Sequence, residues 1–175
     1  PANPQLDDEQ RKALDALLRS TNGVSVFRGG AGTGKSFVLR ELVDQLRQFG
    51  RNVVVLAPQR QQVVEMEKAG FPSPTTVANF LIKRELPDSA VIVVDEAGQI
   101  GGRQMLELVR LIHERHGRLV LSGDTRQHGA VEASDALLAI ERHAGMKPVE
   151  LQKIRRQDPS LGRDVEERKH IRMYR

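Results

Sequence analysis

Short apolar runs alternate with amphipathic segments along most of this chain. Four runs rich in β-branched residues predict buried strands, at residues 24–27, 53–57, 91–94 and 119–122. Apolar residues at helical spacing predict helices at 8–19, 35–49, 60–69, 76–84, 102–115 and 132–143. Continuous apolar strands alternating with helices are typical of a parallel sheet covered on both faces. We therefore predict one α/β domain over residues 1–157, followed by a marginally ordered, charged segment at 158–175.

Composition narrows the class of protein only partly. The 175 residues include no cysteine, which excludes disulfides and thiolate metal sites and favours a reducing compartment such as the cytoplasm. No apolar run is long enough to span a membrane, so we expect no membrane partner. Residues 1–150 carry 19 basic and 19 acidic side chains, so the net charge of +4 lies in the last 25 residues. Charge alone therefore does not identify a nucleic-acid partner.

The most specific motif is the run GGAGTGKS at residues 29–36, which completes the phosphate-loop pattern G-x-x-x-x-G-K-[ST]. It lies between a predicted strand and a predicted helix, so backbone N–H groups and a helix N-terminus surround one point. Lys35 supplies a mobile cation for the β- and γ-phosphates, and the Ser36 hydroxyl can hold Mg²⁺. We predict a nucleoside triphosphate site made by Gly30, Ala31, Gly32, Thr33, Gly34, Lys35 and Ser36.

An acid pair follows the third apolar run. Asp95 ends the predicted strand at 91–94, where P-loop NTPases place the carboxylate that holds Mg²⁺. The adjacent Glu96 can orient and deprotonate an attacking water, which favours hydrolysis over transfer to a second substrate. We therefore predict Asp95 as a metal ligand and Glu96 as a catalytic residue.

Two glutamines are further candidates. Gln127, in the run GDTRQ after the last predicted strand, can both donate and accept hydrogen bonds and so report the γ-phosphate. Gln10 fits a helix capping box with Asp7, but an amide can also pair with adenine N6 and N7. The residues alone leave both roles of Gln10 open.

The order of five motifs resembles that of superfamily I DNA helicases. They are GGAGTGKS, then APQ at 57–59, DEAG at 95–98, GDTRQ at 123–127 and IRRQ at 154–157. Within the superfamily the chain looks like the RecD-like group, and most like the helicase part of conjugative relaxases of the MobF type. The resemblance implies the first of two RecA-like motor domains, with ATP and Mg²⁺ in a cleft that a second domain completes. We thus expect a piece of a longer protein, with 158–175 leading toward that domain.

The resemblance also implies residue roles. Gln10 would recognise adenine, Gln127 would couple nucleotide state to DNA, and Arg156 would contact the γ-phosphate during cleavage, with Arg155 a weaker candidate. DNA contacts would come from the loop after the second strand and from the segment TVANFL at 76–81. The corresponding side chains here are those of Gln59, Arg60, Thr76 and Asn79. The sequence departs from the family pattern at Gln59, where Thr is usual.

These features predict an ATP-driven motor domain of a helicase or translocase acting on single-stranded DNA. One alternative is another P-loop enzyme such as a small-molecule kinase, which would usually need an Arg-rich lid that no segment after the third strand supplies. The other is a nucleotide-binding or DNA-docking module without efficient turnover. Hydrolysis that single-stranded DNA stimulates is expected only of the motor.

Overall fold

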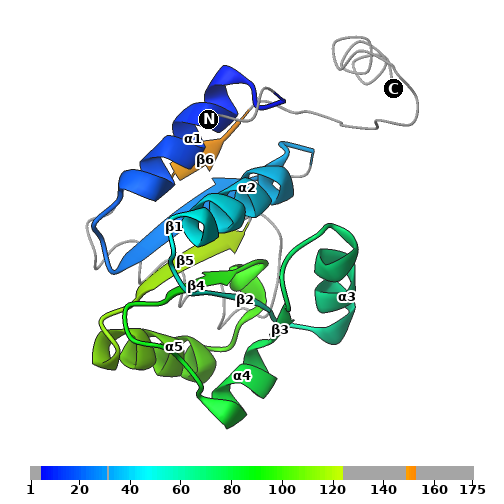
Figure 1. Ribbon diagram of the computed structural model, residues 1–175. Helices are drawn as coiled ribbons and strands as arrows, with labels where there is room; N and C mark the ends of the chain where they lie inside the picture. The colour runs from blue at the N-terminus through cyan, green and yellow to red at the C-terminus, as the bar shows by residue number, and fades with distance from the viewer. Residues whose placement is uncertain (1–4, 31, 124–148, 153–175) are drawn as a thin grey trace.

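The computed structural model describes residues 5–30, 32–123 and 149–152 (Figure 1). Several predicted features lie outside these residues. They are the helix at 132–143, the segment at 158–175 and the side chains of Ala31, Gln127 and Arg156.

The described residues alternate between strands and helices, as the apolar pattern predicts. The helices are α1 (Asp8–Arg19), α2 (Lys35–Gln48), α3 (Arg60–Lys68), α4 (Val77–Lys83), the short 3₁₀ helix η1 (Ala97–Gln99) and α5 (Gly102–Glu114). The strands are β1 (Val24–Gly29), β2 (Val53–Ala57), β3 (Thr75–Thr76), β4 (Val91–Val94), β5 (Arg118–Gly123) and β6 (Val149–Leu151).

These strands form one parallel sheet in the order β3-β2-β4-β5-β1-β6. β5 pairs with β1 in a register that runs from Val24↔Leu119 to Arg28↔Gly123. Each crossover carries the chain back to the same starting edge, so the strands end together at the opposite edge. The predicted α/β fold with a parallel sheet is confirmed.

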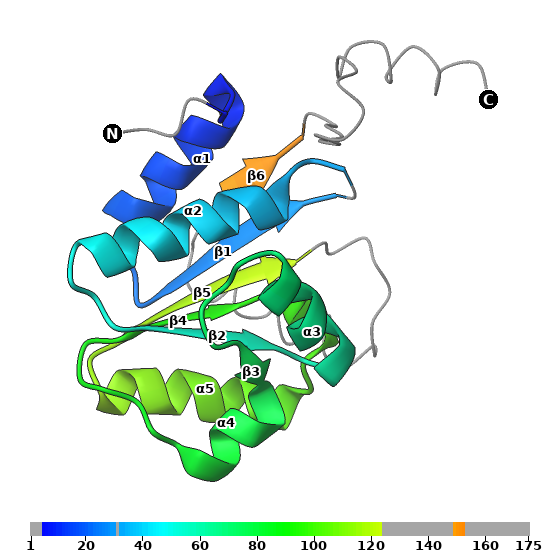
Figure 2. The ribbon, with the colours of Figure 1, turned by 45° about the vertical axis from the view of Figure 1, so that its right-hand side comes forward.

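Two apolar layers cover the two faces of the sheet. Alternate side chains of one strand enter opposite layers: in β4, Val91 and Val93 pack toward α1, α2 and α3, whereas Ile92 and Val94 pack toward α4 and α5. Figure 2 shows α4 and α5 on the opposite side of the sheet from α1 and α2. Burial on both faces explains why β4 reads as the continuous apolar run VIVV.

The observed elements differ from the predicted ones mainly at their ends. β1 and β5 extend to Gly29 and Gly123, beyond the predicted limits of 27 and 122. Gly123 is paired with Arg28 of β1, and Gly29 is paired with Leu151 of β6. β3, β6 and η1 were not predicted, since two or three residues make no periodic pattern. Among the described residues, no helix combines the length and apolar character needed to cross a membrane.

An arginine at the edge where the strands begin forms a hydrogen bond with α1. Arg118 at the start of β5 donates from Nη2 to the carbonyl of Leu17, at 2.9 Å. Burial lowers the pKa of its guanidinium, and the charge of Arg51 lowers it further. The bond holds the C-terminal half of α1 against the sheet, which helps to fix where Gln10 lies at the other end of the helix.

A truncation on α5 tests this packing. Leu108 is fully buried and Leu106 is 50% exposed on the same helix. We expect Leu108→Ala to lower the free energy of unfolding by about 2–5 kcal/mol. Leu106→Ala should change it by only about 0.5 kcal/mol, because it removes little buried surface. Urea unfolding followed by circular dichroism checks this, and equal effects of the two variants would contradict the assigned α5 face.

Candidate functional site

The predicted site residues gather at the edge of the sheet where the parallel strands end. Gly29 ends β1 and leads into the phosphate loop, while Asp95 and Glu96 follow β4. β5 lies between these two strands. Because adjacent strands are about 4.8 Å apart, the ends of β1 and β4 are separated by about 10 Å. Phosphate-loop and acid-pair candidates are thus close enough to face one bound phosphate chain with its metal ion.

The phosphate loop is a tight turn that depends on its glycines. Gly32 and Gly34 have φ values of 79° and 77°, which L side chains rarely adopt. The backbone N–H and the hydroxyl of Thr33 both donate to the carbonyl of Gly30, at 3.3 and 2.8 Å. A Cβ on Gly29 would lie 2.7 Å from the Thr33 hydroxyl oxygen, so only glycine fits beside this turn.

The loop delivers the chain directly into the N-terminus of α2. Gly34 occupies the N-cap position, and no side chain caps the helix. The N–H groups of the first turn are therefore available to an anion, and the helix dipole favours negative charge there. Lys35 and Ser36 open the helix; Ser36 is exposed and Lys35 half-buried. Among the described residues, the Lys35 ammonium has no hydrogen-bond or ion-pair partner. These features fit a phosphate ligand.

The acid pair is held in a strained turn. Glu96 has φ 52° and ψ 42°, a left-handed conformation that costs a non-glycine residue about 1–3 kcal/mol. Its N–H donates to Oδ1 of Asp95 at 2.9 Å, and the Asp95 N–H donates to the carbonyl of Leu56 in β2, also at 2.9 Å. Both carboxylates are half-buried. Such a turn fixes two adjacent carboxylates at the strand end instead of leaving them in a mobile loop.

The structure shows the capping role of Gln10, one of the two roles that its sequence context left open. The capping box with Asp7 is present: each backbone N–H donates to the other residue's side-chain oxygen, at 2.9 and 3.1 Å. Gln10 is nevertheless fully buried, and its Nε2 has no hydrogen-bond partner among the residues that the structure describes. A buried unpaired amide donor is costly, and an acceptor such as adenine N7 would satisfy it. Capping thus uses the side-chain oxygen, whereas the buried nitrogen takes no part in it.

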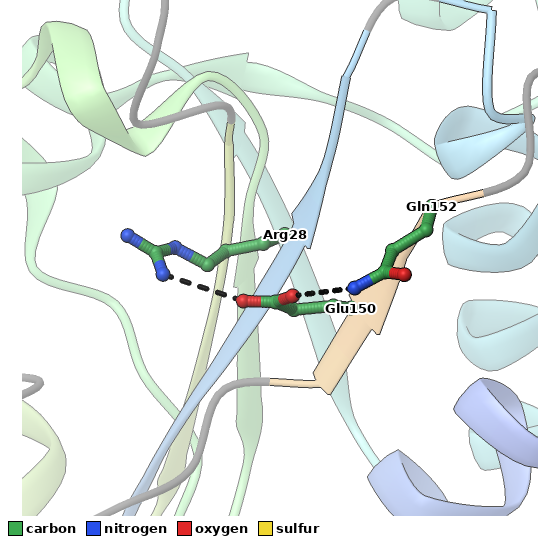
Figure 3. Close-up of polar contacts among 3 residues, drawn as sticks. All are labelled: Arg28, Glu150 and Gln152. Atoms are coloured by element: carbon green, nitrogen blue, oxygen red, sulfur yellow. Dashed lines mark hydrogen bonds and ion pairs between the residues drawn. The ribbon is translucent and has the colours of Figure 1, made fainter.

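A polar network joins β1, β6 and α1 beside the phosphate loop (Figure 3). Arg28, which directly precedes Gly29, donates from Nη1 to Glu150 of β6 at 3.4 Å, and Gln152 contacts the other oxygen of that carboxylate. The Gln152 backbone N–H reaches Glu9 of α1 at 3.3 Å. The network therefore places the first turn of α1, with Gln10, at the same edge as the phosphate loop. Sequence reasoning missed the Arg28–Glu150 and Glu9–Gln152 contacts, which join residues more than 120 positions apart.

The predicted DNA-contact residues gather at the other end of this edge, where β2 and β3 lie side by side. Gln59 and Arg60 follow β2 and are exposed. Thr76 caps α4 by accepting from the Asn79 N–H at 3.1 Å, and the Asn79 side chain donates to Thr75 at 2.8 Å. These bonds do not use the Thr76 hydroxyl proton or the side-chain oxygen Oδ1 of Asn79, so both groups could contact a ligand.

Two predicted catalytic residues, Gln127 and Arg156, lie outside the described residues, as does Ala31 of the phosphate loop. β5, which leads toward Gln127, is adjacent to β1 as expected. Within the described residues no cluster of three or more His, Cys, Asp or Glu could hold a metal ion. A metal site built from Ser36 and Asp95 would therefore need phosphate oxygens as further ligands.

Comparison with known proteins assigns the chain to a family. A family model described as "AAA domain" matches residues 5–172. A probable conjugal transfer protein TraA of Sinorhizobium fredii is 29% identical over 151 residues, which are 83% of this chain and 14% of the relative. The multifunctional conjugation protein TraI of Escherichia coli K12 is 28% identical over 170 residues, 90% and 10% of the two chains. An ATP-dependent RecD2 DNA helicase of Deinococcus radiodurans is 28% identical over 152 residues, 82% and 21%.

Solved structures agree on the fold. A Pif1 helicase from Candida albicans matches with a TM-score of 0.60 at 23% identity, over 96% of this chain and 43% of that one. Bacteroides Pif1 bound to ssDNA matches with a TM-score of 0.61 at 17% identity, over 90% and 44%. The predicted resemblance to RecD-like helicases and conjugative relaxases, and the RecA-like fold, are confirmed. The chain spans only 10–14% of the length of the two conjugation proteins given above.

The close approach at Gly29 can be tested by adding one methyl group. We expect Gly29→Ala to displace the Thr33 hydroxyl, to destabilise the loop by about 1–3 kcal/mol and to weaken ATP binding. Gly23→Ala, at the other end of the same strand, is the matched control because no atom lies within 4 Å of its added Cβ. Calorimetric titration with ATP checks the pair. Unchanged affinity of the Gly29 variant would contradict a site at this loop.

Proposed function

The chain belongs to the AAA domain family, and on that basis we propose that it is the first ATP-driven motor domain of a DNA helicase acting on single-stranded DNA. The observation that carries the proposal is the arrangement at one sheet edge. An uncapped helix N-terminus with its glycine turn lies about two strand spacings from a strained acid pair, and the candidate DNA residues end the next two strands. The RecD2 and TraI relatives support a helicase within this family.

ATP and Mg²⁺ fit the residues of this edge. The N–H groups from Gly30 to Ser36 and the Lys35 ammonium would hold the β- and γ-phosphates. The Ser36 hydroxyl and the Asp95 carboxylate would hold Mg²⁺, which when bound neutralises charge on the phosphate oxygens. Glu96 would orient a water and accept its proton, and Gln10 would donate from Nε2 to adenine N7.

Single-stranded DNA would bind along the ends of β2 and β3. Gln59, Arg60, Thr76 and Asn79 offer amide, guanidinium and hydroxyl groups that suit phosphate oxygens and carry no sequence readout. Bacteroides Pif1, which shares this fold, was crystallised with ssDNA.

We propose residues 1–157 as this motor domain, with 158–175 leading toward a second RecA-like domain. The short span of the chain relative to TraA and TraI supports this. Arg156 and Gln127 would act at the cleft between the domains, where an arginine stabilises charge on the transferring phosphoryl group. We further propose that turnover is slow without the second domain, and that the protein works in the cytoplasm as part of a relaxase-helicase.

Nucleotide binding is tested by removing the Lys35 charge. We expect Lys35→Ala to weaken ATP binding by about 10- to 100-fold, because a hydrogen bond to a charged group contributes about 1.5–3 kcal/mol. Lys68→Ala, an exposed lysine at the end of α3, is the control and should bind as the parent does. If the two variants bind ATP equally well, the loop is not the phosphate site.

The acid pair is tested by two conservative amides. Glu96→Gln should bind ATP with Mg²⁺ normally but block hydrolysis, because an amide cannot accept the proton of water. Asp95→Asn should weaken the Mg²⁺ dependence of binding. Single-turnover hydrolysis with and without single-stranded DNA measures the effect of Glu96→Gln. Titration of ATP binding with Mg²⁺ measures the effect of Asp95→Asn. In the parent, hydrolysis that DNA does not stimulate would favour a kinase over a motor, and binding without turnover under either condition would favour a docking module.

Phosphate-led DNA binding makes a prediction about salt. Oligonucleotides of equal length should bind alike whatever their sequence, with affinity falling as salt rises. Arg60→Ala should reduce the slope of log affinity against log salt by about 0.7, the value for one phosphate contact on a single strand. Arg115→Ala, an exposed arginine just after α5, should leave the slope unchanged. Fluorescence anisotropy at several salt concentrations checks both, and equal slopes for the parent and the Arg60 variant would exclude that contact.

A further inference from the structure

Two glutamines connect the nucleotide half of the edge to the DNA half. Gln62 lies in the first turn of α3, and Gln99 ends η1, the 3₁₀ helix that follows the acid pair. The Gln62 Nε2 donates to the Gln99 Oε1 at 2.9 Å. This bond joins two elements that the chain separates by 37 residues. Neither residue belongs to a motif that the sequence analysis identified.

The bond is one link in an unbroken chain of short hydrogen bonds. The Gln59 N–H donates to Oε1 of Gln62 at 3.0 Å. The Gln62 side chain therefore contacts both Gln59, in the loop after β2, and Gln99. The Gln99 N–H donates to the carbonyl of Glu96 at 3.0 Å. The Glu96 N–H reaches Asp95 at 2.9 Å. Each hydrogen bond between Gln59 and Asp95 is 3.0 Å or less, and covalent bonds within Gln62, Gln99 and Glu96 join one to the next.

Glu96, next to the far end of this chain, has a strained backbone. Glu96 is held in the left-handed region, from which a non-glycine residue relaxes unless its surroundings prevent it. The bond from Gln99 to the Glu96 carbonyl is one of the contacts that prevent relaxation, and Gln62 holds Gln99 in turn. Whatever orders the first turn of α3 therefore also favours the strained state of the acid pair.

We propose that Gln62 and Gln99 are positioning residues that couple DNA binding at Gln59 and Arg60 to the conformation of Glu96. This inference rests on the proposed function, since it requires a nucleotide at the acid pair and DNA at the loop. DNA phosphate on the loop orders the N-terminus of α3, which fixes the Gln62 amide between Gln59 and Gln99. The strained turn is then stabilised, and the affinity for nucleotide rises. By linkage, nucleotide raises the affinity for DNA by the same factor.

An amide pair suits this role. Gln99 is exposed and Gln62 half-buried, so the bond can form and break without leaving a buried polar group unpaired. Each amide carries both a donor and an acceptor, which lets Gln62 accept from one element while it donates to another. The Gln62–Gln99 bond contributes little to stability in the absence of ligands. DNA bound at the Gln59 loop can therefore strengthen it and so affect the nucleotide site.

The coupling is measured on the 175-residue chain by binding alone. The affinity for a fluorescent, non-hydrolysable ATP analogue with Mg²⁺ is titrated without and with saturating oligo-dT. The ratio of the two affinities is the coupling factor, which in coupled sites is typically about 5 or more. A change that merely lowers stability does not selectively alter this ratio, and thermal melting shows whether each variant is folded.

Four variants separate the amide bond from nearby effects. Gln99→Ala removes the acceptor and should bring the coupling factor close to 1, with analogue affinity without DNA within about twofold of the parent. Gln99→Glu keeps an acceptor for the Gln62 amide and should retain coupling. Adding Gln62→Glu to Gln99→Glu places two acceptors face to face and should abolish it. Gln61→Ala, the adjacent exposed glutamine of α3, is the matched control and should couple as the parent does.

The outcomes distinguish this inference from the function on which it rests. A parent chain that binds neither the analogue nor the oligonucleotide contradicts the proposed function. A parent that binds both with a coupling factor of 1 contradicts only the coupling. A coupling factor that survives Gln99→Ala, or that Gln61→Ala lowers equally, shows that the amide bond does not carry it.

Discussion

Parallel pairing of the strands is the constraint on which the rest of this molecule depends. Because β1, β5, β4 and β2 run in one direction, the loops that follow them emerge at a single edge. The register is fixed by burial on both faces: a slip of one residue would exchange Val91 and Val93 with Ile92 and Val94 between two cores that are already full. The apolar strand residues thus fix the positions of the polar site residues, although no apolar strand residue is itself part of a site.

The edge where the strands end carries two groups of residues, one suited to a nucleotide and one suited to the phosphates of DNA. At one end, the helix N-terminus without a side-chain cap, Lys35 and a Gln10 amide nitrogen that has no partner among the described residues suit a nucleotide. At the other end Gln59, Arg60 and Asn79 offer groups that suit a phosphate backbone. β4 ends between these two groups of residues, so the acid pair lies between the candidate nucleotide site and the candidate DNA site. The hydrogen bonds from Asp95 to Gln59 make this position a physical connection rather than mere proximity.

Local features of the fold and site were predictable, and contacts between distant residues were not. The phosphate loop follows from glycines that must adopt positive φ, and the Asp7–Gln10 capping box follows from a spacing of three. β6 escaped prediction because three residues with exposed Glu150 at their centre show no apolar run. The Gln62–Gln99 bond and the burial of the Gln10 nitrogen depend on tertiary packing, which no local pattern encodes.

We propose that one edge of the sheet binds a nucleotide through the phosphate loop and Gln10. Amide NMR spectra of the chain during titration with ATP and Mg²⁺ test it most directly, because each N–H reports its own surroundings. We expect large shifts for the N–H groups of Gly32, Gly34 and Ser36 and for the Gln10 side-chain amide, with little change at Leu119 on the opposite edge. Saturable binding that leaves the loop amides unshifted would contradict it.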